Sequence, residues 1–205
     1  MPERSAATSD IPDVSRETVA RLERFCALLL LWNARINLVS RADLGNLWSR
    51  HVRDSLALIP LMPRAPSHVI DIGSGGGFPG LVLAIATGIP FHLVESDQRK
   101  AAFLREAARE TDTAITLHAC RIENATPPPA PVITARAVAP LPRLLGWAVP
   151  HLAPGGMCIF PKGRTVDDEL TRARTGWHMR IARVMSPIDP SSTILCLSEI
   201  APVGP

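Results

Sequence analysis

Residues 69–80 read VIDIGSGGGFPG, and this stretch decides how the rest of the chain is interpreted. An apolar, β-branched run carries an acid near its end, a glycine cluster follows, and Pro79 leads into the apolar run 81–86. This order predicts a buried strand, a tight turn and the start of a helix. Glycines suit such a turn because they accept positive φ and let the backbone approach a ligand closely. Proline suits the first turn of the helix, where an amide hydrogen is not needed. We therefore expect a ligand to lie over this loop.

The residues around the glycines bear on the kind of ligand. Gly75, Gly77 and Gly80 match the pattern G-x-G-x-x-G by letter, which is typical of dinucleotide sites but weak evidence alone. Asp71 argues against a dinucleotide, because a carboxylate at the strand end would repel a pyrophosphate at the helix N-terminus. That carboxylate would instead suit positive charge, such as the ammonium and sulfonium groups of S-adenosylmethionine. A structural glycine turn without any ligand is the remaining alternative.

Strand and helix patterns alternate through the rest of the chain. Strands are predicted at 69–72, 91–95, 114–119, 131–135 and 155–163, with helices at 81–86, after Asp97, at 141–152 and at 166–174. The segments 177–185 and 192–200 predict a closing hairpin-like pair. This alternation predicts an α/β fold with a doubly wound, Rossmann-like sheet over residues 64–205. Residues 1–63 predict an N-terminal helical extension, with one helix opening at Ser15 and a second running from 43 or 46 to 61.

Polar residues follow the predicted strands at the points where those strands end. These residues are Asp71, Glu95, residues 121–123, Arg136 and Lys162. Because the carboxyl ends of parallel strands meet at one edge of an open α/β sheet, where ligands bind, we expect these residues to share a site. Glu95 lies about 20 residues beyond the glycine loop, the place where an acid receives ribose hydroxyls in this architecture. A solvated strand end is the alternative interpretation of Glu95.

Composition places the chain among ordinary globular proteins. It has 205 residues, is 46% hydrophobic and carries a net charge of +3, which does not by itself indicate a polyanionic partner. Lys100 and Lys162 are the only lysines among 22 basic residues. This arginine bias fits either a GC-rich genome or phosphate recognition. The four scattered cysteines predict neither a metal site nor a disulfide framework. The absence of a signal sequence and of a transmembrane-length apolar run predicts a soluble, cytoplasmic protein.

The N-terminal extension contains a polar cluster at residues 50–55, RHVRDS. His51 and Asp54 are three residues apart, so they would share one face of a helix. A surface contact between these two side chains is one interpretation. The other is a polar patch turned toward the ligand pocket.

Several motifs together resemble a known family. They are WN at 32–33, INL at 36–38, RH at 50–51, DS at 54–55, DIGSGGGFPG at 71–80, TARA at 134–137 and KG at 162–163. The acid and glycines at 71–77 are similar to the first motif of class I methyltransferases. The ordered set resembles the RsmG family, also called GidB, over about residues 22–165. That family methylates N7 of a guanine in 16S rRNA of the small ribosomal subunit, with S-adenosylmethionine as the donor.

The resemblance implies a set of cofactor contacts. Glu95 matches the acid that binds ribose, where relatives often carry aspartate. Thr134 stands where a serine is common, and the region after Lys162 cannot be aligned residue by residue. The implied cofactor-binding residues are Asp71, Gly73, Gly75, Gly77, Phe78, Glu95, Ile122, Glu123 and Arg136.

The chemistry of guanine N7 explains what the sequence lacks. N7 has a free lone pair and no proton, so its methylation needs positioning and exclusion of water rather than a general base. We accordingly assign no catalytic base and no metal. An arginine or lysine near the base could hydrogen-bond guanine O6 and phosphate oxygens, which makes Arg136 a candidate on the substrate side too. The other candidate RNA contacts are Asn37, Arg50, His51, Asp54, Arg121 and Lys162.

Three alternative functions compete with rRNA methylation. The first is a small-molecule methyltransferase, although such an enzyme would usually cover its substrate with an apolar lid. The second is a nicotinamide-dependent oxidoreductase, against which Asp71 counts. The third is a non-catalytic ribosome-binding protein on the same scaffold. With any of them we expect a monomer, because no long apolar surface stripe is left over.

Overall fold

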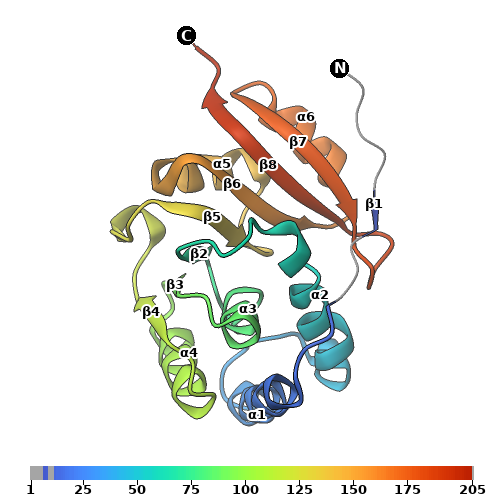
Figure 1. The fold of residues 1–205 in the computed structure, drawn as a ribbon, viewed down its shortest axis with the longest axis vertical. Helices are drawn as coiled ribbons and strands as arrows, with labels where there is room; N and C mark the ends of the chain where they lie inside the picture. The colour runs from blue at the N-terminus through green and yellow to red at the C-terminus, as the bar shows by residue number, and fades with distance from the viewer. Residues whose placement is uncertain (1–6, 9–11, 205) are drawn as a thin grey trace.

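The computed structural model describes residues 7–8 and 12–204, whose strands form one mixed sheet (Figure 1). The strands are β1 (Ala7–Thr8), β2 (Val69–Ile72), β3 (Phe91–Val94), β4 (Ile115–His118), β5 (Ala130–Ala135), β6 (Leu152–Lys162), β7 (Trp177–Met185) and β8 (Thr193–Pro202). They lie in the order β1-β7-β8-β6-β5-β2-β3-β4. The central strands β6, β5, β2, β3 and β4 pair in parallel, whereas β8 runs antiparallel to both β6 and β7. This is a Rossmann-like α/β fold, as predicted.

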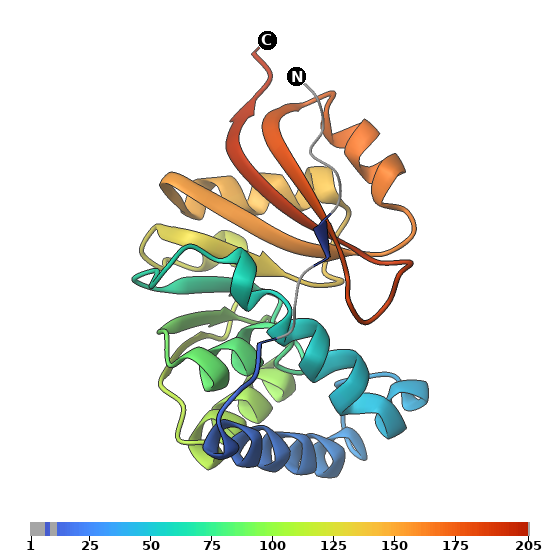
Figure 2. The same ribbon diagram turned by 45° about the vertical axis from the view of Figure 1, so that its right-hand side comes forward.

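Helices cover both faces of the sheet. They are α1 (Arg16–Asn33), α2 (Arg53–Leu56), α3 (Gly80–Thr87), α4 (Gln98–Glu110), α5 (Leu141–Ala148) and α6 (Val166–Ala173). Helices α1, α3 and α4 pack on one face, in a core that contains Phe25 and Phe103, whose ring centroids lie 6.2 Å apart. Helices α5 and α6 pack on the other face. Figures 1 and 2 both place α1 beside α4 at one end of the molecule and α6 beside the β7–β8 hairpin at the other.

Local signals in the sequence account for most of these elements. The Ser15 hydroxyl accepts a hydrogen bond from the Thr18 amide at 3.1 Å and so caps α1, as predicted. Asp97 caps α4 in the same way, through the amides of Arg99 and Lys100. Strand β2 is buried on both faces, which explains its continuous apolar pattern. The closing pair of strands is also present, as β7 and β8.

The predicted second helix is not a regular helix. Its residues form a 3₁₀ segment (Arg41–Asn46), a π-helical turn (Leu47–Val52), the short α2 and a second 3₁₀ segment (Ile59–Leu61). The Arg53 amide donates to the Trp48 carbonyl, five residues back, which is the wider spacing of a π turn. The apolar face is retained, since Val52 and Leu56 are buried. Irregular turns of this kind are frequent at functional sites.

The N-terminal segment shares its core with the sheet region. The Arg21 side chain of α1 donates to the backbone carbonyls of Thr111 and Asp112, at 2.7 and 2.9 Å, just after α4. Strand β1, which the sequence did not predict, pairs in parallel with β7 at Val184 and Met185. The division into 1–63 and 64–205 therefore stays a prediction about sequence organisation, because the two parts are packed together.

Strand order fixes where a ligand can bind. From β2 the chain moves outward through β3 and β4 on one side, and then returns to β5 on the other side of β2. The carboxyl ends of β2 and β5 therefore flank a topological switch point, where a crevice opens in doubly wound sheets. The glycine loop follows β2 directly into this crevice.

Candidate functional site

A cavity of about 330 Å³ lies at this switch point. Its walls are the glycine loop, Glu95 after β3, residues 120–123 after β4 and residues 136–138 after β5. Trp147 of α5 and Leu38 of the N-terminal segment complete it. We refer to it as the loop pocket. The strand ends thus converge as the sequence analysis expected.

Backbone geometry explains the glycines of the loop. Gly73, Gly75 and Gly77 have φ of 69°, 52° and 89°, in the left-handed region that side chains disfavour. A Cβ on Gly73 would also lie 2.6 Å from Cγ2 of Val138. The loop therefore needs glycine for its shape and for its close approach to the segment after β5.

Asp71 lies beneath the glycine loop instead of facing the pocket. Its side chain is fully buried, and Oδ1 accepts a hydrogen bond of 2.7 Å from the Thr134 hydroxyl. A Cβ on Gly80 would lie 2.6 Å from Cβ and Cγ of Asp71, so glycine is needed where α3 begins. Burial raises the pKa of Asp71 to about 6, while the Thr134 hydrogen bond opposes that rise. Asp71 is not among the residues that line the loop pocket. The expected direct contact with a ligand is therefore replaced by support of the loop from below.

Glu95 takes the position at the pocket that the sequence suggested for Asp71. One of its oxygens accepts from the Gly75 amide at 2.8 Å, and the other accepts from the Asp97 amide at 2.7 Å. In a dinucleotide site, the amides of the glycine loop bind the pyrophosphate. Here the Glu95 carboxylate accepts a hydrogen bond from one of those amides. Asp71, which is buried below the loop, would therefore not face a pyrophosphate there.

The remaining predicted cofactor residues fall into two groups. Gly73, Gly75, Phe78, Ile122, Glu123 and Arg136 all line the loop pocket, and so does Arg121, which had been assigned to RNA. Gly77 does not line it and packs against Phe25 instead. Sequence reasoning missed Ser96, Lys100 and Trp147. Ser96 and Lys100 follow Glu95 by one and five residues, so their position just after a predicted strand end is a signal from which they could have been predicted to line the pocket.

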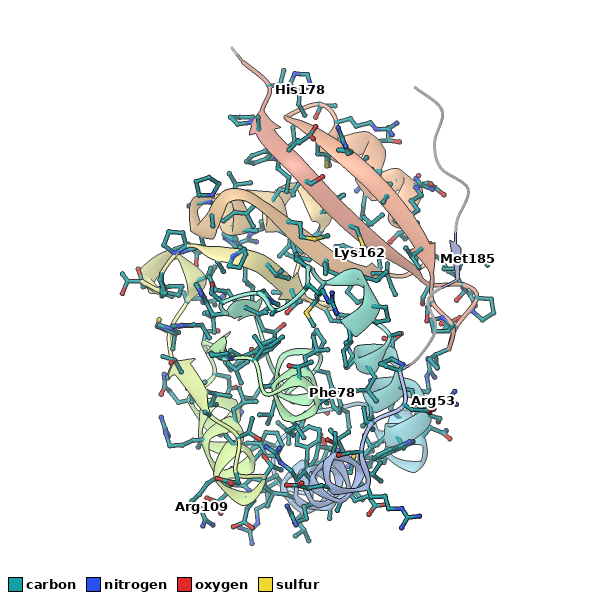
Figure 3. The ribbon with its side chains drawn as sticks, in the orientation of Figure 1. Arg53, Phe78, Arg109, Lys162, His178 and Met185 are labelled. Atoms are coloured by element: carbon teal, nitrogen blue, oxygen red, sulfur yellow. The ribbon has the colours of Figure 1, made fainter. Side chains whose placement is uncertain are left out.

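Arg136 links the loop pocket to a second polar centre. Its guanidinium lies over the Phe78 ring, 5.1 Å from the centroid, and 3.5 Å from Oδ2 of Asp54. The side chain is 19% exposed, and burial lowers the pKa of the guanidinium. Asp54 lies on α2, so the predicted polar patch of the N-terminal segment does turn toward the pocket. Figure 3 shows Phe78 within the body of the molecule, while Arg109 lies at its edge.

Two further cavities adjoin Arg136. One, of about 400 Å³, is bordered by Asp54, Arg136 and Ser186; the other, of about 420 Å³, by Arg50, Asp54 and Arg136. The Ser186 hydroxyl donates to Oδ1 of Asp54 at 3.1 Å, which ties the loop between β7 and β8 to α2. We call these two cavities together the outer cleft.

His51 forms part of the wall of the outer cleft. Its ring packs against Phe78 at a tilt of 33° with a centroid separation of 5.0 Å, and Nε2 lies 3.6 Å from Oδ2 of Asp43. Within the described part of the chain, neither buried ring nitrogen has a hydrogen-bond partner. Burial and the nearby charge of Arg136 lower the pKa of His51 to about 4, against the opposing effect of Asp43. The imidazole is therefore neutral at physiological pH.

Lys162 lines the first cavity of the outer cleft, at the expected ligand edge, but its ammonium group is already paired, whereas Asn37 lies away from both sites. Lys162 is only 9% exposed, and its Nζ donates to Oε2 of Glu169 at 2.8 Å and to the Ala139 carbonyl at 3.0 Å. Asn37 is exposed and lines neither the loop pocket nor the outer cleft. Asn33, at the end of α1, stabilises the turn that follows the helix, since its side-chain oxygen accepts hydrogen bonds from the amides of Leu38 and Val39. Arg50 is exposed at the rim, close to Asp43.

Sequence comparison identifies the relatives of this chain. A family model described as rRNA small subunit methyltransferase G, or GidB, matches residues 18–188. This chain belongs to that family. A ribosomal RNA small subunit methyltransferase G of Gluconobacter oxydans is 55% identical over 186 residues, which cover 91% of this chain and 96% of that protein. The protein of the same name from Rhodospirillum centenum is 56% identical over 192 residues, or 93% and 88% of the two chains. The family resemblance drawn from the motifs is thereby confirmed.

Solved structures of methyltransferases share the fold of this family member. An O-methyltransferase from Bacillus cereus in complex with SAH superposes with a TM-score of 0.59 over 88% of this chain and 91% of the other, at 14% identity. TrmN from Thermus thermophilus gives a TM-score of 0.57 over 75% and 50%, at 22% identity. The sheet is therefore that of the class I methyltransferases.

Two further features of the described residues bear on other classes of site. Among the helices of the described residues, none has both the length and the apolar character needed to span a bilayer. The described residues also contain no group of three or more His, Cys, Asp or Glu side chains placed to hold a metal ion.

Proposed function

We propose that this protein transfers a methyl group from S-adenosylmethionine to N7 of a guanine in 16S rRNA of the small ribosomal subunit. The observation that carries the proposal is the match to the methyltransferase G family across residues 18–188, joined to a pocket at the switch point of a methyltransferase sheet. The N7 lone pair would form the new N–CH₃ bond as the S–CH₃ bond breaks. The donor would thus leave as a neutral thioether, and the positive charge would move to the purine.

The loop pocket fits this donor chemically. Glu95 holds the Gly75 amide and leaves its carboxylate at the pocket wall, where it can accept hydrogen bonds from ribose hydroxyls. Ile122 offers an apolar surface for a purine ring, and Glu123 lies beside it. Because residue 73 is glycine, no side chain projects toward Val138, and the pocket stays open there. These residues would bind and orient the donor, which is the main requirement for a nucleophile that carries no proton.

The outer cleft supports an RNA substrate over a small molecule. Its walls carry charged and polar side chains (Arg50, Asp54, Arg136, Ser192), whereas an enzyme for a small apolar substrate would be expected to close over it with an apolar lid. Arginines suit phosphate oxygens because their forked donors match them. Arg50 and Arg121, both exposed, are placed to meet an RNA backbone around the pocket. We assign no role in RNA binding to Lys162, which is held by Glu169.

Two less specific features complete the proposal. We infer that the protein acts as a monomer, since the sequence leaves over no long apolar surface stripe. We also infer that it works in the cytoplasm, where small ribosomal subunits are available. Sedimentation at micromolar concentration would check the first inference, and co-fractionation with ribosomal particles would check the second.

The test is direct detection of the modified base. Primer extension after base-selective cleavage, applied to rRNA from cells with and without this gene, should give a stop at one guanine of 16S rRNA only when the gene is present. Purified protein and radiolabelled S-adenosylmethionine should restore the stop on small subunits from the deletion strain. In parallel, S-adenosylhomocysteine should raise the melting temperature of the protein, and NADH should not. A stop that is independent of the gene, or stabilisation by NADH alone, would refute the proposal.

A further inference from the structure

We propose that Arg136 and Asp54 act as a pair that distinguishes the target guanine from adenine, with Arg136 donating to O6 and Asp54 accepting from N1–H. This inference rests on the proposed function, because it concerns how that same site selects its base. It assigns Asp54 a specificity role in addition to its place in the polar patch.

The positions of the two residues match the order of atoms along a guanine. Arg136 lines both the loop pocket and the outer cleft, so it stands between them. Asp54 lines only the outer cleft, one step farther from the loop pocket. On guanine, N7 and O6 lie on the Hoogsteen edge, and N1–H follows O6 around the ring on the Watson–Crick edge. A base with N7 directed at the donor pocket would therefore present O6 near Arg136 and N1–H near Asp54.

The polarity of the pair also matches guanine and opposes adenine. Guanine offers an acceptor at O6 and a donor at N1–H, whereas adenine offers a donor at its 6-amino group and an acceptor at N1. An Arg–Asp pair presents a donor and then an acceptor. Adenine in the same pose would put its amino group against a guanidinium and its N1 lone pair against a carboxylate, so both contacts would be repulsive.

The surroundings of the pair make these interactions effective. Arg136 is 19% exposed and Asp54 is 16% exposed, so both groups are largely shielded from water, which strengthens their hydrogen bonds. The Phe78 ring packs against the guanidinium, and the Ser186 hydroxyl donates a hydrogen bond to Oδ1 of Asp54. The Asp54 oxygen nearest Arg136 is Oδ2, at 3.5 Å, so the two groups form an ion pair and lie side by side, where one base can contact both.

Asp54 should contribute more as the reaction proceeds. The transfer places a positive charge on the purine, which makes N1–H a stronger hydrogen-bond donor. A carboxylate that accepts from N1–H therefore binds the transition state more tightly than the substrate. No proton needs to move for this effect.

A structural role for Asp54 has to be separated from base selection. Its link to Ser186 holds the loop between β7 and β8, so a loss of activity in Asp54→Asn could come from loop movement alone. Ser186→Ala provides the matched control, since it keeps the carboxylate and removes that hydrogen bond, together with those that the hydroxyl accepts from the amides of Ile188 and Asp189. Asn at position 54 keeps the size of the side chain and adds an amide donor, which could meet N1 of adenine.

The experiment uses small subunits reconstituted with 16S rRNA that carries guanine, inosine or adenine at the methylated position. The kcat/KM of labelled methyl transfer is measured for wild type, Asp54→Asn and Ser186→Ala, with S-adenosylhomocysteine affinity as the check on folding. For wild type we expect inosine, which keeps O6 and N1–H, to react within about threefold of guanine. Asp54→Asn should lower kcat/KM on guanine by about 10- to 100-fold and lower the guanine-to-adenine preference by at least about tenfold, the size of a lost base contact. Ser186→Ala should keep that preference.

Three results would overturn the inference while leaving the proposed function intact. The first is rejection of inosine by the wild type as strongly as adenine, which would mean that the 2-amino group is read instead. The second is an unchanged guanine-to-adenine preference in Asp54→Asn. The third is the same loss of preference in Ser186→Ala. Failure of the wild type to methylate the guanine substrate would instead count against the proposed function. The inosine comparison needs no variant, so it can refute the inference even if Asp54→Asn does not fold.

Discussion

The ammonium group of Lys162 lies 2.8 Å from Oε2 of Glu169, at the end of β6 and on α6 respectively. The same Glu169 oxygen accepts from the Leu141 amide at 2.7 Å, so the pair also holds the start of α5. Lys162, labelled in Figure 3, thus joins β6 to α6 and to the start of α5, two helices that pack on one face of the sheet. A lysine that the sequence placed at the ligand edge is therefore part of the framework of that edge.

Replacing this lysine should chiefly lower stability. Lys162→Met would leave Glu169 without its cation in a site that is only 16% exposed, at a cost of about 1 to 3 kcal/mol of unfolding free energy. Urea denaturation would measure the cost. Arg164→Met, at an exposed position two residues on, should change stability by less than about 0.5 kcal/mol. Burial alone would raise the pKa of Glu169, but Lys162 and the Leu141 amide lower it. The deficit should therefore be present at neutral pH and shrink as acid protonates Glu169. A deficit of equal size in both variants would contradict the assignment.

Gly73→Ala should weaken binding in the loop pocket. The new Cβ would sit at φ 69° and 2.6 Å from Val138, so both the loop and the neighbouring wall must shift. We expect the affinity for S-adenosylhomocysteine to fall by at least about fivefold, as the strain of one left-handed alanine is about 1 kcal/mol or more. Calorimetric titration would measure it. Gly45→Ala is the control, because nothing lies within 4 Å of its added Cβ. Equal affinities in the two variants would show that the loop tolerates a side chain.

Two helical glycines should respond to alanine in opposite directions. Gly80→Ala at the start of α3 would push a Cβ into the buried Asp71 side chain, at a cost of about 1 to 3 kcal/mol for an overpacked core. Gly146→Ala in α5 meets nothing within 4 Å and should stabilise the protein by about 0.5 to 1 kcal/mol. Thermal and urea unfolding followed by circular dichroism would give both values. A stabilising Gly80→Ala would mean that Asp71 does not pack against α3 as described.

His51 should make the fold less stable in mild acid. Its pKa is lowered from 6.5 to about 4, so the folded protein keeps the ring neutral while the unfolded chain takes up a proton. The stabilisation is fully present above pH 6.5 and is lost as the pH falls toward 4, at up to about 1.4 kcal/mol per pH unit. The wild type should therefore lose about 1 to 3 kcal/mol more than His51→Gln over this interval.

The comparison between these two proteins isolates His51. The pKa values of His92 and His118 are also lowered, by burial first, and both residues remain in the variant. Their contribution therefore cancels in the difference between the two pH profiles. Parallel profiles from pH 7 to pH 4 would mean that His51 is not held neutral by the fold.

Sequence patterns predicted the features that depend on local rules. The glycine loop could be predicted because its turn requires positive φ. The caps at Ser15 and Asp97 could be predicted because their side-chain oxygens accept hydrogen bonds from helix amides. The convergence of Glu95 and Arg136 could be predicted because parallel strands end at one edge of the sheet. Each of these needs only neighbouring residues or the fold class. Such features can therefore be predicted without any knowledge of long-range contacts.

Features that depend on long-range partners could not be predicted in this way. The burial of Asp71 depends on Thr134 and Gly80, and the withdrawal of Lys162 depends on Glu169. The π turn before α2 keeps a helical apolar pattern, so periodicity alone could not separate it from a regular helix. No pattern in the sequence singles out Ser186, because its contact with Asp54 forms only when the β7–β8 loop packs against α2.

The two binding regions differ in when the chain completes them. The loop pocket is built from residues 38–147, whereas the outer cleft also needs residues 186–194. The ribosome therefore synthesises the last residue that lines the loop pocket well before the last one that lines the outer cleft. The base selection proposed for Arg136 and Asp54 thus depends on a wall of the cleft that is made late in synthesis.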